Sequence, residues 1–455
     1  MIPIAGKKIL LLGLGLHGGG AATAAWLHRH GAKLIVSDLR GRKLLEPSLH
    51  ALAQRGGITY VLGRHREGDV RWADYVVYNP GVPKESKYLQ LARRLNKPVY
   101  NEASLFFDRC RAPVIAVTGT RGKSTTASLI AAMCKAKNPR TILAGNIATA
   151  FMLDVVDRAT RAHLVVLELS SWQLEGLNIV RAAPEIAVVT NLLPDHLNRY
   201  ASLAHYYRSK KEIFRHQSAG HFLVLNRDDQ LLSQWSSEAG SRVVFFSKKD
   251  FRPLVKGSGL FGEHNLENAA AAITAAKLCG VSMRDIKAVL AHPPVLSGRQ
   301  EVIAKKGGIT YVNDTTATTP EAGIAALARF GARSKFGARP PFHPPLGKGG
   351  NGGVILIAGG ADKKLVFAEW ARRVKTYCKQ VHLLAGDASA KQKRALRGFK
   401  KLSAGHNDLG VLVKKAADGA AKGDIILFSP AAASFNMWPH EFARGDAFIK
   451  AVSRV

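Results

Sequence analysis

The chain has 455 residues, of which 47% are hydrophobic and 22% charged, and its formal net charge is +33. This length predicts about three domains, and the composition is that of a globular protein. No apolar run approaches the roughly 18 uncharged residues that a membrane-spanning helix needs. The basic residues are spread along the whole chain without a zinc-finger, RNA-recognition or basic-zipper pattern. We therefore attribute the charge to a basic host proteome and expect no specific nucleic-acid partner.

The N-terminal sequence MIPIAGKKILLLGLGL has lysines before an apolar stretch, as a signal peptide does. The stretch is short and runs into glycines without an A-x-A-like site, so a buried first strand is the better interpretation. The four cysteines are widely scattered and show no C-x-x-C spacing, which indicates neither a zinc site nor a disulfide framework. We expect a reduced, cytoplasmic, monomeric protein.

Apolar runs of strand length alternate with helical patterns along the chain, which predicts an α/β fold with parallel sheets. The predicted strands are, in chain order, 9–12, 33–37, 74–78, 114–117, 163–169, 185–190, 222–226, 310–312, 354–358, 381–384 and 424–428. The pattern breaks twice and so predicts a Rossmann-like domain (1–108), a central P-loop ATPase-type domain (109–297) and a Rossmann-like C-terminal domain (298–455). Residues 330–353, rich in Pro, Gly and basic residues, are predicted to be a disordered insertion.

The first glycine motif, Gly13-Leu-Gly15-Leu-His-Gly18, follows a predicted strand and opens a helix, and Asp38 ends the next strand. In dinucleotide-binding folds the amides of such a turn contact phosphate and the acid contacts a ribose. Glycines needed only for tight strand–helix packing are the alternative. The motif indicates a nucleotide-like diphosphate and does not by itself indicate hydride transfer.

The second motif, GTRGKST, is shorter than the usual phosphate loop, G-x-x-x-x-G-K-[ST], because Val117 stands where the first glycine is expected. It nevertheless lies between a predicted strand and helix. Its amides can hold phosphates, Lys123 can supply a positive charge, and the Ser124 hydroxyl can bind Mg²⁺.

Two further strand ends carry polar residues. Glu168 ends the strand in VVLELSSWQLEGL, and Asp195-His196 follows the next strand, in TNLLPDHLNRY. Ligands of α/β sheets bind at the carboxyl ends of the strands. A carboxylate and an imidazole at this edge therefore predict metal and phosphate chemistry, although His196 alone could be an ordinary loop histidine.

With these motifs the sequence resembles the Mur ligase family. GTRGKST, GNI, LELSSWQLE, DHLNRY, YYRSKKEIF, HNLENAAAA, SGRQE, NDTTATTPEA, GGADKK and SPAAASF appear in the family's order over nearly the whole chain. LELSSWQLE and SPAAASF favour the members that add D-glutamate, and the short loop is the family's own form. The resemblance implies ATP-dependent amide formation between UDP-N-acetylmuramoyl-L-alanine and D-glutamate through an acyl phosphate, in peptidoglycan precursor synthesis.

The resemblance also implies the ligands of each substrate. Two Mg²⁺ sites are implied, one at Ser124 and Glu168, the other at His196 and a carbamylated lysine, which the alignment places at Lys211 rather than Lys210. The residues implied for ATP are Gly119, Thr120, Arg121, Gly122, Lys123, Ser124, Thr125, Asn265, Asn268, Arg299 and Asp314. Those implied for the uridine-nucleotide substrate are Leu16, His17, Asp38, Arg40, Asn79, Gly81, Asn146, Ser170 and Gln173. Those implied for the acceptor amino acid are Thr318, Lys363 and Ser434.

Two departures from the family pattern concern the acceptor. Thr316 stands where a lysine is common, and Phe442 is one position away from the usual aromatic residue. A related ligase with another acceptor therefore stays open, whereas a folylpolyglutamate synthase lacks the N-terminal glycine-motif domain. A nicotinamide-dependent oxidoreductase would leave GTRGKST unexplained. A degenerate nucleic-acid binder would not retain Lys123, Glu168 and His196 together.

Overall fold

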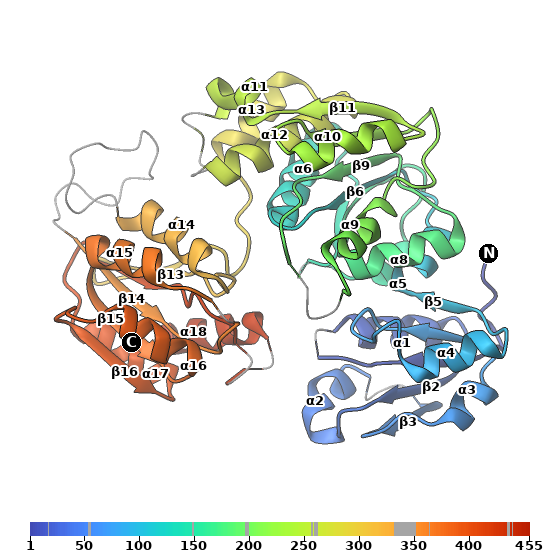
Figure 1. Cartoon of the computed structure of the whole chain (residues 1–455), viewed down its shortest axis with the longest axis horizontal. Helices are drawn as coiled ribbons and strands as arrows, with labels where there is room; N and C mark the ends of the chain where they lie inside the picture. Colours follow the sequence, from blue (N-terminus) through green and yellow to red (C-terminus); the bar gives the residue numbers. More distant parts are fainter. Residues whose placement is uncertain are drawn as a thin grey trace. The chain divides into compact units, whose positions relative to one another are not determined.

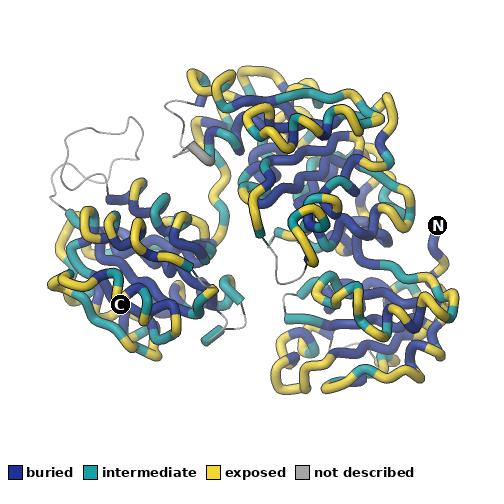
Figure 2. The backbone as a smooth tube through the Cα atoms, viewed as in Figure 1, coloured by how far each residue is buried: buried dark blue, intermediate teal, exposed yellow. Residues whose placement is uncertain are grey.

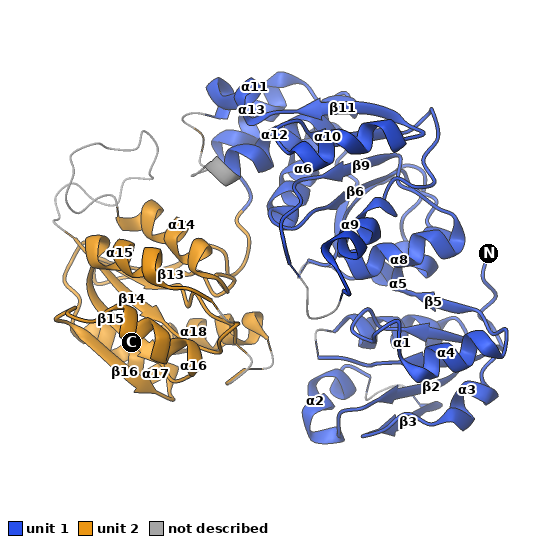
Figure 3. Cartoon of the chain, in the orientation of Figure 1, with its two compact units in different colours: residues 1–256, 263–294 blue, residues 257–262, 295–455 orange. Residues whose placement is uncertain are grey.

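Three sheets, each covered by helices, make up the described part of the chain (Figure 1). The computed structural model describes residues 1–16, 18–52, 56–147, 150–195, 200–255, 258, 263–331, 352–363, 365–434, 437–438 and 440–455. Contacts divide the chain into two compact units (Figure 3), unit 1 with residues 1–256 and 263–294, and unit 2 with residues 257–262 and 295–455. The predicted α/β fold is confirmed.

The N-terminal sheet is entirely parallel, with the strand order β3-β2-β1-β4-β5. Its strands are β1 (Lys8–Leu12), β2 (Lys33–Asp38), β3 (Ile58–Leu62), β4 (Tyr75–Tyr78) and β5 (Val99–Asn101). Its helices are α1 (Gly19–Arg29), α2 (Arg42–His50), α3 (Glu67–Trp72) and α4 (Lys87–Arg94). Side chains alternate along β1, so Ile9 and Leu11 pack with α1 and α2 while Leu10 and Leu12 pack with α3 and α4.

The central sheet is also parallel, in the order β11-β10-β9-β6-β8-β7. Its strands are β6 (Val114–Thr118), β7 (Thr141–Gly145), β8 (Leu164–Glu168), β9 (Ile186–Val189), β10 (Phe222–Asn226) and β11 (Arg242–Phe246). The helices around it are α5 (Glu102–Arg109), α6 (Lys123–Lys137), α7 (Met152–Val156), α8 (Ser171–Val180), α9 (Leu203–Lys211), α10 (Gln230–Gln234), η1 (Trp235–Glu238), α11 (Lys248–Val255), α12 (Glu263–Leu278) and α13 (Met283–Ala291).

Helix α5 follows the N-terminal sheet in the chain but packs against α7 and α8 of the central layer. Asn101 caps α5 by accepting the Ser104 N–H at 3.0 Å. The amide of Asn101 also donates to the carbonyls of Trp172 at 3.3 Å and Gln173 at 3.2 Å. A Cβ at Gly176 would lie 1.9 Å from Asn101 Oδ1, so α8 needs a glycine there. Asn101 thus ties the first sheet to the second.

Unit 2 contains a mixed sheet of order β12-β13-β17-β14-β15-β16, in which β12 is antiparallel to β13 and the other pairs are parallel. Its strands are β12 (Glu301–Lys306), β13 (Ile309–Asn313), β14 (Val354–Ala358), β15 (Cys378–Leu384), β16 (Leu402–His406) and β17 (Ile425–Phe428). Its helices are α14 (Pro320–Gly331), α15 (Ala368–Tyr377), α16 (Asp387–Ala395), α17 (Leu409–Asp418) and α18 (Glu441–Ser453). The clusters on its two faces involve α14 to α16 and α17 with α18, respectively.

The predicted insertion begins inside an ordered helix. Phe330 and Gly331 end α14, and Phe330 is buried in the core of unit 2, because its ring belongs to the apolar face of that helix. Residues 332–351 lie outside the described residues, so the disorder predicted for them stays a prediction. Figure 2 shows the buried strands at the centre of each layer and the exposed outer faces of the helices. Among the described residues no helix combines the length and the hydropathy needed to cross a bilayer.

Candidate active site

The first glycine loop lies at the carboxyl end of β1, beside the loops that follow β2 and β4. A Cβ at Gly20 would lie 2.0 Å from the Leu14 carbonyl oxygen, so α1 can approach the strand this closely only with glycine there. Asp38 at the end of β2 is 2% exposed, and its carboxylate accepts the N–H groups of Gly15 and Arg40, each at 2.9 Å. Asp38 therefore shapes the loop as well as ending the strand.

Asn79, at the end of β4, lies against the same loop. Its Oδ1 accepts the Gly81 N–H at 3.0 Å, and a Cβ at Gly15 would lie 3.3 Å from its Nδ2. Of the residues predicted for the uridine-nucleotide substrate, the structure thus brings Leu16, Asp38, Arg40, Asn79 and Gly81 together after three neighbouring strands, whereas Asn146, Ser170 and Gln173 follow strands of the central sheet. Leu16 is half-buried in the loop, and His17 lies outside the described residues.

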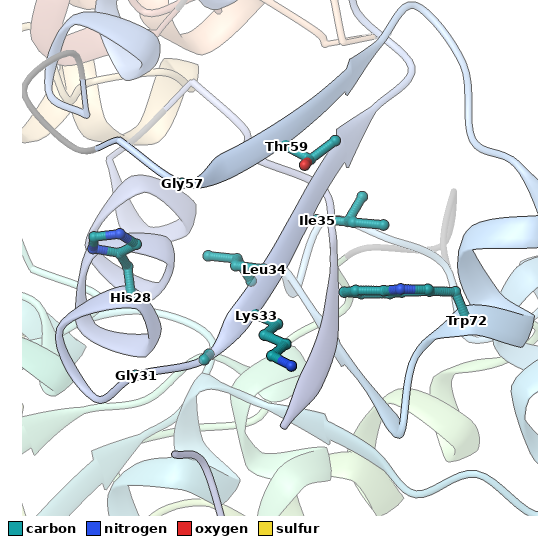
Figure 4. A pocket seen from close by; sticks show the side chains of 9 residues that line it. His28, Gly31, Lys33, Leu34, Ile35, Gly57, Thr59 and Trp72 are labelled. Carbon is teal, nitrogen blue, oxygen red and sulfur yellow. The ribbon is translucent and has the colours of Figure 1, made fainter. Parts of the chain in front are cut away.

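A cavity of about 450 Å³ lies elsewhere on the N-terminal sheet (Figure 4). It is lined by His28 from α1, by Lys33 and Ile35 of β2, by Thr59 of β3 and by Trp72 at the end of α3, among others. Lys33 begins β2, so the cavity reaches the amino ends of the strands, opposite the glycine loop. None of the described residues predicted for the uridine nucleotide lines it.

The second glycine loop connects β6 to α6, and two of its glycines are required by their surroundings. Gly119 has φ +144°, and a Cβ there would lie 1.9 Å from Thr190 Oγ1. Gly122 has φ +81°, and a Cβ there would lie 2.0 Å from Asn268 Oδ1. Helix α6 begins directly afterwards at Lys123, so its free amide groups point into the loop, as in phosphate-binding sites.

Residues after β9, the strand beside β6, hold this loop. Thr190 Oγ1 donates to the Arg121 carbonyl at 2.7 Å, and Asn191 Oδ1 accepts the Arg121 N–H at 2.9 Å. Lys123 Nζ donates to the Thr120 carbonyl at 3.1 Å. The sequence did not single out Thr190 and Asn191 as site residues. The feature of the sequence that could have identified them is their position at the end of a predicted strand, between GTRGKST and DHLNRY.

The two lysines that end α9 lie in different surroundings. Lys210 is 1% exposed, and its Nζ donates to the Gly119 carbonyl at 2.8 Å. Burial, and then the nearby charge of Lys123, lower the pKa of Lys210 well below its usual value. Lys211 instead pairs with Glu238 at 2.5 Å, and its ammonium lies over the Trp235 ring. In the structure Lys210, and not the predicted Lys211, therefore reaches the phosphate loop, because the two side chains leave the helix in different directions.

Glu168 ends β8, on the other side of β6 from β9, and is 2% exposed. Its Oε1 accepts from Asn146 Nδ2 at 3.4 Å, and its Oε2 is buried without a hydrogen-bond partner in the described part of the chain. A buried carboxylate oxygen with free lone pairs is the kind of ligand that Mg²⁺ takes. His196, predicted for a second metal ion, lies outside the described residues.

Helix α12 brings its two asparagines to the phosphate loop. Asn268 is buried and donates to Asn265 Oδ1 at 3.1 Å, and its own Oδ1 accepts from Thr126 of α6 at 3.5 Å. At the start of α8, Ser170 and Gln173 form a capping box, in which Gln173 Oε1 accepts from the Ser170 N–H and hydroxyl at 3.0 Å each. A hydrogen bond between Asn265 and Asn268, and those between Ser170 and Gln173, thus fix the conformations of these side chains.

In unit 2 the predicted residues follow the adjacent parallel strands β13, β17 and β14. Asp314 is 3% exposed and accepts from Ser429 Oγ at 2.7 Å. It also accepts the Gln300 N–H at 3.1 Å. Burial raises the pKa of Asp314 to about 7, although both hydrogen bonds and the charge of Arg299 act to lower it. Ser434 is buried, and its hydroxyl has no partner among the described residues. Lys363 is exposed.

The remaining acceptor residues lie in the loop after β13. Thr318 is half-buried, and its N–H donates to the Thr316 carbonyl at 2.9 Å. The Thr316 hydroxyl donates to the Gly298 carbonyl at 3.0 Å. Thr316, which stands where the family usually has a lysine, is therefore hydrogen-bonded to the backbone of the loop before β12.

Comparison with known proteins decides the family. Residues 7–101 match the MurD-like N-terminal domain of Mur ligases, and residues 117–258 match the Mur ligase middle domain. The chain is 37% identical to the UDP-N-acetylmuramoylalanine–D-glutamate ligase of Roseiflexus sp. (strain RS-1), over 99% of both chains. It is 32% identical to the enzyme of that name from Clostridioides difficile (strain 630), over 97% of both.

The chain belongs to the Mur ligase family.

Solved structures agree with this fold. The Mur ligase superposes on the UDP-N-acetylmuramate–alanine ligase MurC of Thermotoga maritima with a TM-score of 0.62 at 19% identity, over 98% of this chain and 99% of that one. The MurF ligase of the same organism, solved in complex with ADP, gives a TM-score of 0.56 at 20% identity, over 99% and 96%. At these identities the similarity concerns the fold.

Proposed function

We infer that this Mur ligase is a UDP-N-acetylmuramoylalanine–D-glutamate ligase, which uses ATP to join D-glutamate to UDP-N-acetylmuramoyl-L-alanine in peptidoglycan synthesis. The observation that carries this inference is the similarity, over nearly the full length, to relatives with that name at 30–37% identity. The loop at Gly119–Ser124, fitted between β9 and α12, is consistent with use of ATP.

The chemistry divides into two steps. The carboxylate of the muramoyl-alanine substrate attacks the γ-phosphorus of ATP, and ADP leaves as the acyl phosphate forms. The amine of D-glutamate then attacks the acyl carbon, loses a proton and displaces inorganic phosphate. Phosphoryl transfer of this kind depends on alignment and on neutralising charge more than on covalent help.

The residues of the phosphate loop fit the first step. The N-terminus of α6 and the Lys123 ammonium would stabilise the phosphate oxygens, and the surrounding bonds to Arg121 keep the loop in place before ATP arrives. Ser124 and Glu168 Oε2, which has no partner within the described residues, suit Mg²⁺, which when bound would neutralise phosphate charge.

Lys210 takes the place of Lys211 as the candidate for carbamylation. Its Nζ lies at the Gly119 carbonyl, inside the phosphate site, whereas the Lys211 ammonium is paired with Glu238. The lowered pKa of Lys210 favours its neutral amine, which would add CO₂ and release a proton; the resulting anionic carbamate oxygen is the ligand that a second metal ion at His196 would require. The chemistry of the donor set therefore favours Lys210.

For the acceptor we propose Thr318, Lys363 and Ser434, with Ser434 as the strongest candidate because its buried hydroxyl has no partner among the residues that the structure describes. A second candidate function, a ligase of the same family for another amino acid, is favoured by Thr316. The lysine usual at this position is missing, and the Thr316 hydroxyl is bound to Gly298, so a cation is absent from that position.

Phosphate release tests both candidates. Purified enzyme, ATP, Mg²⁺ and UDP-N-acetylmuramoyl-L-alanine are mixed with D-glutamate, L-glutamate, L-alanine or glycine, and phosphate is measured with the ligated product. We expect turnover with D-glutamate alone. Turnover with another amino acid and none with D-glutamate would replace the first function by the second.

A further inference from the structure

Arg444, on α18, is a buried cation of unit 2 that lies outside the predicted site residues. Its side chain is 0% exposed. Its Nη2 donates to the Thr315 carbonyl at 2.7 Å, its Nε to Thr315 Oγ1 at 3.2 Å, and its Nη1 to the Ala432 carbonyl at 3.0 Å. Burial lowers the pKa of Arg444 to about 10, although the negative charges of Glu441 and Asp314 act to raise it. The guanidinium is therefore still charged at neutral pH.

These three bonds connect two loops that carry predicted site residues. Residues 314–319, here named the nucleotide loop after Asp314, follow β13 and also contain Thr318, one of the residues predicted for the acceptor. Residues 429–434, the acceptor loop, follow β17 and end with Ser434. Thr315 lies directly after Asp314, and Ala432 lies two residues before Ser434. One guanidinium therefore bonds to the backbones of both loops.

Helix α18 is fitted closely to the nucleotide loop. A Cβ at Gly445 would lie 2.7 Å from Thr315 Cγ2, so the residue after Arg444 has to be glycine for this approach. Thr315 Oγ1 also donates to the Glu441 carbonyl at 2.7 Å, in the first turn of the helix. The position of Arg444 relative to the nucleotide loop is thus fixed from both sides.

The acceptor loop has features that need such support. Ala431 has φ +53°, a left-handed conformation that an alanine adopts only when its surroundings impose it. Ala433 exchanges two backbone hydrogen bonds with Ala361, at 2.9 and 3.1 Å. The buried Ser434 hydroxyl has no partner within the described residues. A strained loop that ends in an unpaired hydroxyl is typical of a binding site held ready for its ligand.

We propose that Arg444 is a positioning residue, whose guanidinium fixes the acceptor loop relative to the nucleotide loop and so holds Ser434 ready for a carboxylate of the incoming amino acid. The proposal rests on the proposed function for the identity of that amino acid. A lysine would keep the charge but could not make three bonds in a planar fork, so it would not hold both loops.

The test compares the wild type with Arg444→Lys and with Lys450→Met, a control that removes an exposed cation from the same helix. In Arg444→Lys we expect the KM for D-glutamate to rise roughly tenfold or more, while the KM for UDP-N-acetylmuramoyl-L-alanine, whose predicted site is in unit 1, changes less than about twofold. Amide hydrogen exchange at Ala433 and Ser434 should be faster than in the wild type. Lys450→Met should change neither quantity.

Each outcome bears on one claim. Equal changes in the KM values of both substrates, or unchanged amide exchange in the acceptor loop, would overturn the positioning role. If Arg444→Lys does not fold, Thr315→Val is used instead, because it removes the hydroxyl that accepts from Arg444 Nε. The same rise in the KM for D-glutamate and the same faster amide exchange are expected for it. A wild type that releases no phosphate with D-glutamate would overturn the proposed function, whereas hydrogen exchange would still decide the role of Arg444.

Discussion

Replacing Gly122 by alanine tests whether the phosphate loop depends on its fit against α12. An alanine at φ +81° costs about 1–2 kcal/mol in backbone strain. Its Cβ, 2.0 Å from Asn268 Oδ1, must also displace that amide, which then loses its bonds to Asn265 and Thr126, at about 1 kcal/mol each. Gly122→Ala should therefore lower the unfolding free energy of unit 1 by about 3 kcal/mol and raise the KM for ATP roughly tenfold or more.

Gly63 is a matched control for this substitution. Its φ is +82°, almost the same as at Gly122, but apart from its chain neighbours no described residue lies within 4 Å of an added Cβ. Gly63→Ala should thus show the backbone strain alone, with an unchanged KM for ATP. Urea unfolding gives the free energies, and initial phosphate-release rates give the KM. Equal losses of stability in the two variants together with equal KM values would refute the reasoning, because the contact with Asn268 would then have no effect.

Three further predictions concern other parts of the molecule. Lys210→Met should reduce phosphate release roughly 100-fold or more, and Lys211→Met should leave it within about twofold. A large loss in Lys211→Met and none in Lys210→Met would instead support Lys211 as the lysine of the phosphate site. Asp38→Ala should raise the KM for the uridine-nucleotide substrate roughly tenfold without changing that for ATP, and parallel changes would show that the two loops are not separate sites. Burial lowers the pKa of His382 from 6.5 to about 4, so the folded form stays neutral where the unfolded chain binds a proton. Relative to His382→Gln, the wild type should lose about 3 kcal/mol of stability in unit 2 as the pH falls from 6.5 to 4, whereas the opposite contribution of Asp314, whose pKa burial raises to about 7, is common to both proteins; urea titrations of the two at several pH values measure this difference.

The apolar runs in the sequence predict the inner strands of the sheets but not those at the edges. The burial of β6, β14 and β17 is complete along their length, so these strands are continuous apolar segments. The strands at the edges are only partly buried and contain polar residues. They are β3, β5, β7, β11, β12 and β16. An edge strand has a neighbour on one side only, so exposed polar positions interrupt its apolar pattern, as in EVIAKK and LSAGH. ITYVL and RVVFF are largely apolar, and these two edge strands were not predicted from the sequence either.

The candidate site shows the same division between local and tertiary information. The positions of Glu168 and of the GTRGKST loop at the carboxyl edge of the central sheet could be predicted, because each stands at the end of a buried strand. The choice between Lys210 and Lys211 could not, because consecutive residues of a helix point about 100° apart and only the packing of α9 decides which one faces the loop. Arg444 carried no motif at all, since its role depends on two loops more than a hundred residues apart in the chain.

The attachment of α5 to the central layer decides where this chain can be divided for study. Cutting after residue 108 would remove α5 from α7 and α8 and expose Leu105 and Phe106, both of which are 0% exposed in the intact chain. It would also leave the Asn101 side chain without the carbonyls of Trp172 and Gln173. An isolated nucleotide-sugar fragment made in this way would tend to aggregate, and its failure to bind would say nothing about the glycine loop. A fragment ending at residue 294, the last residue of unit 1, keeps these contacts.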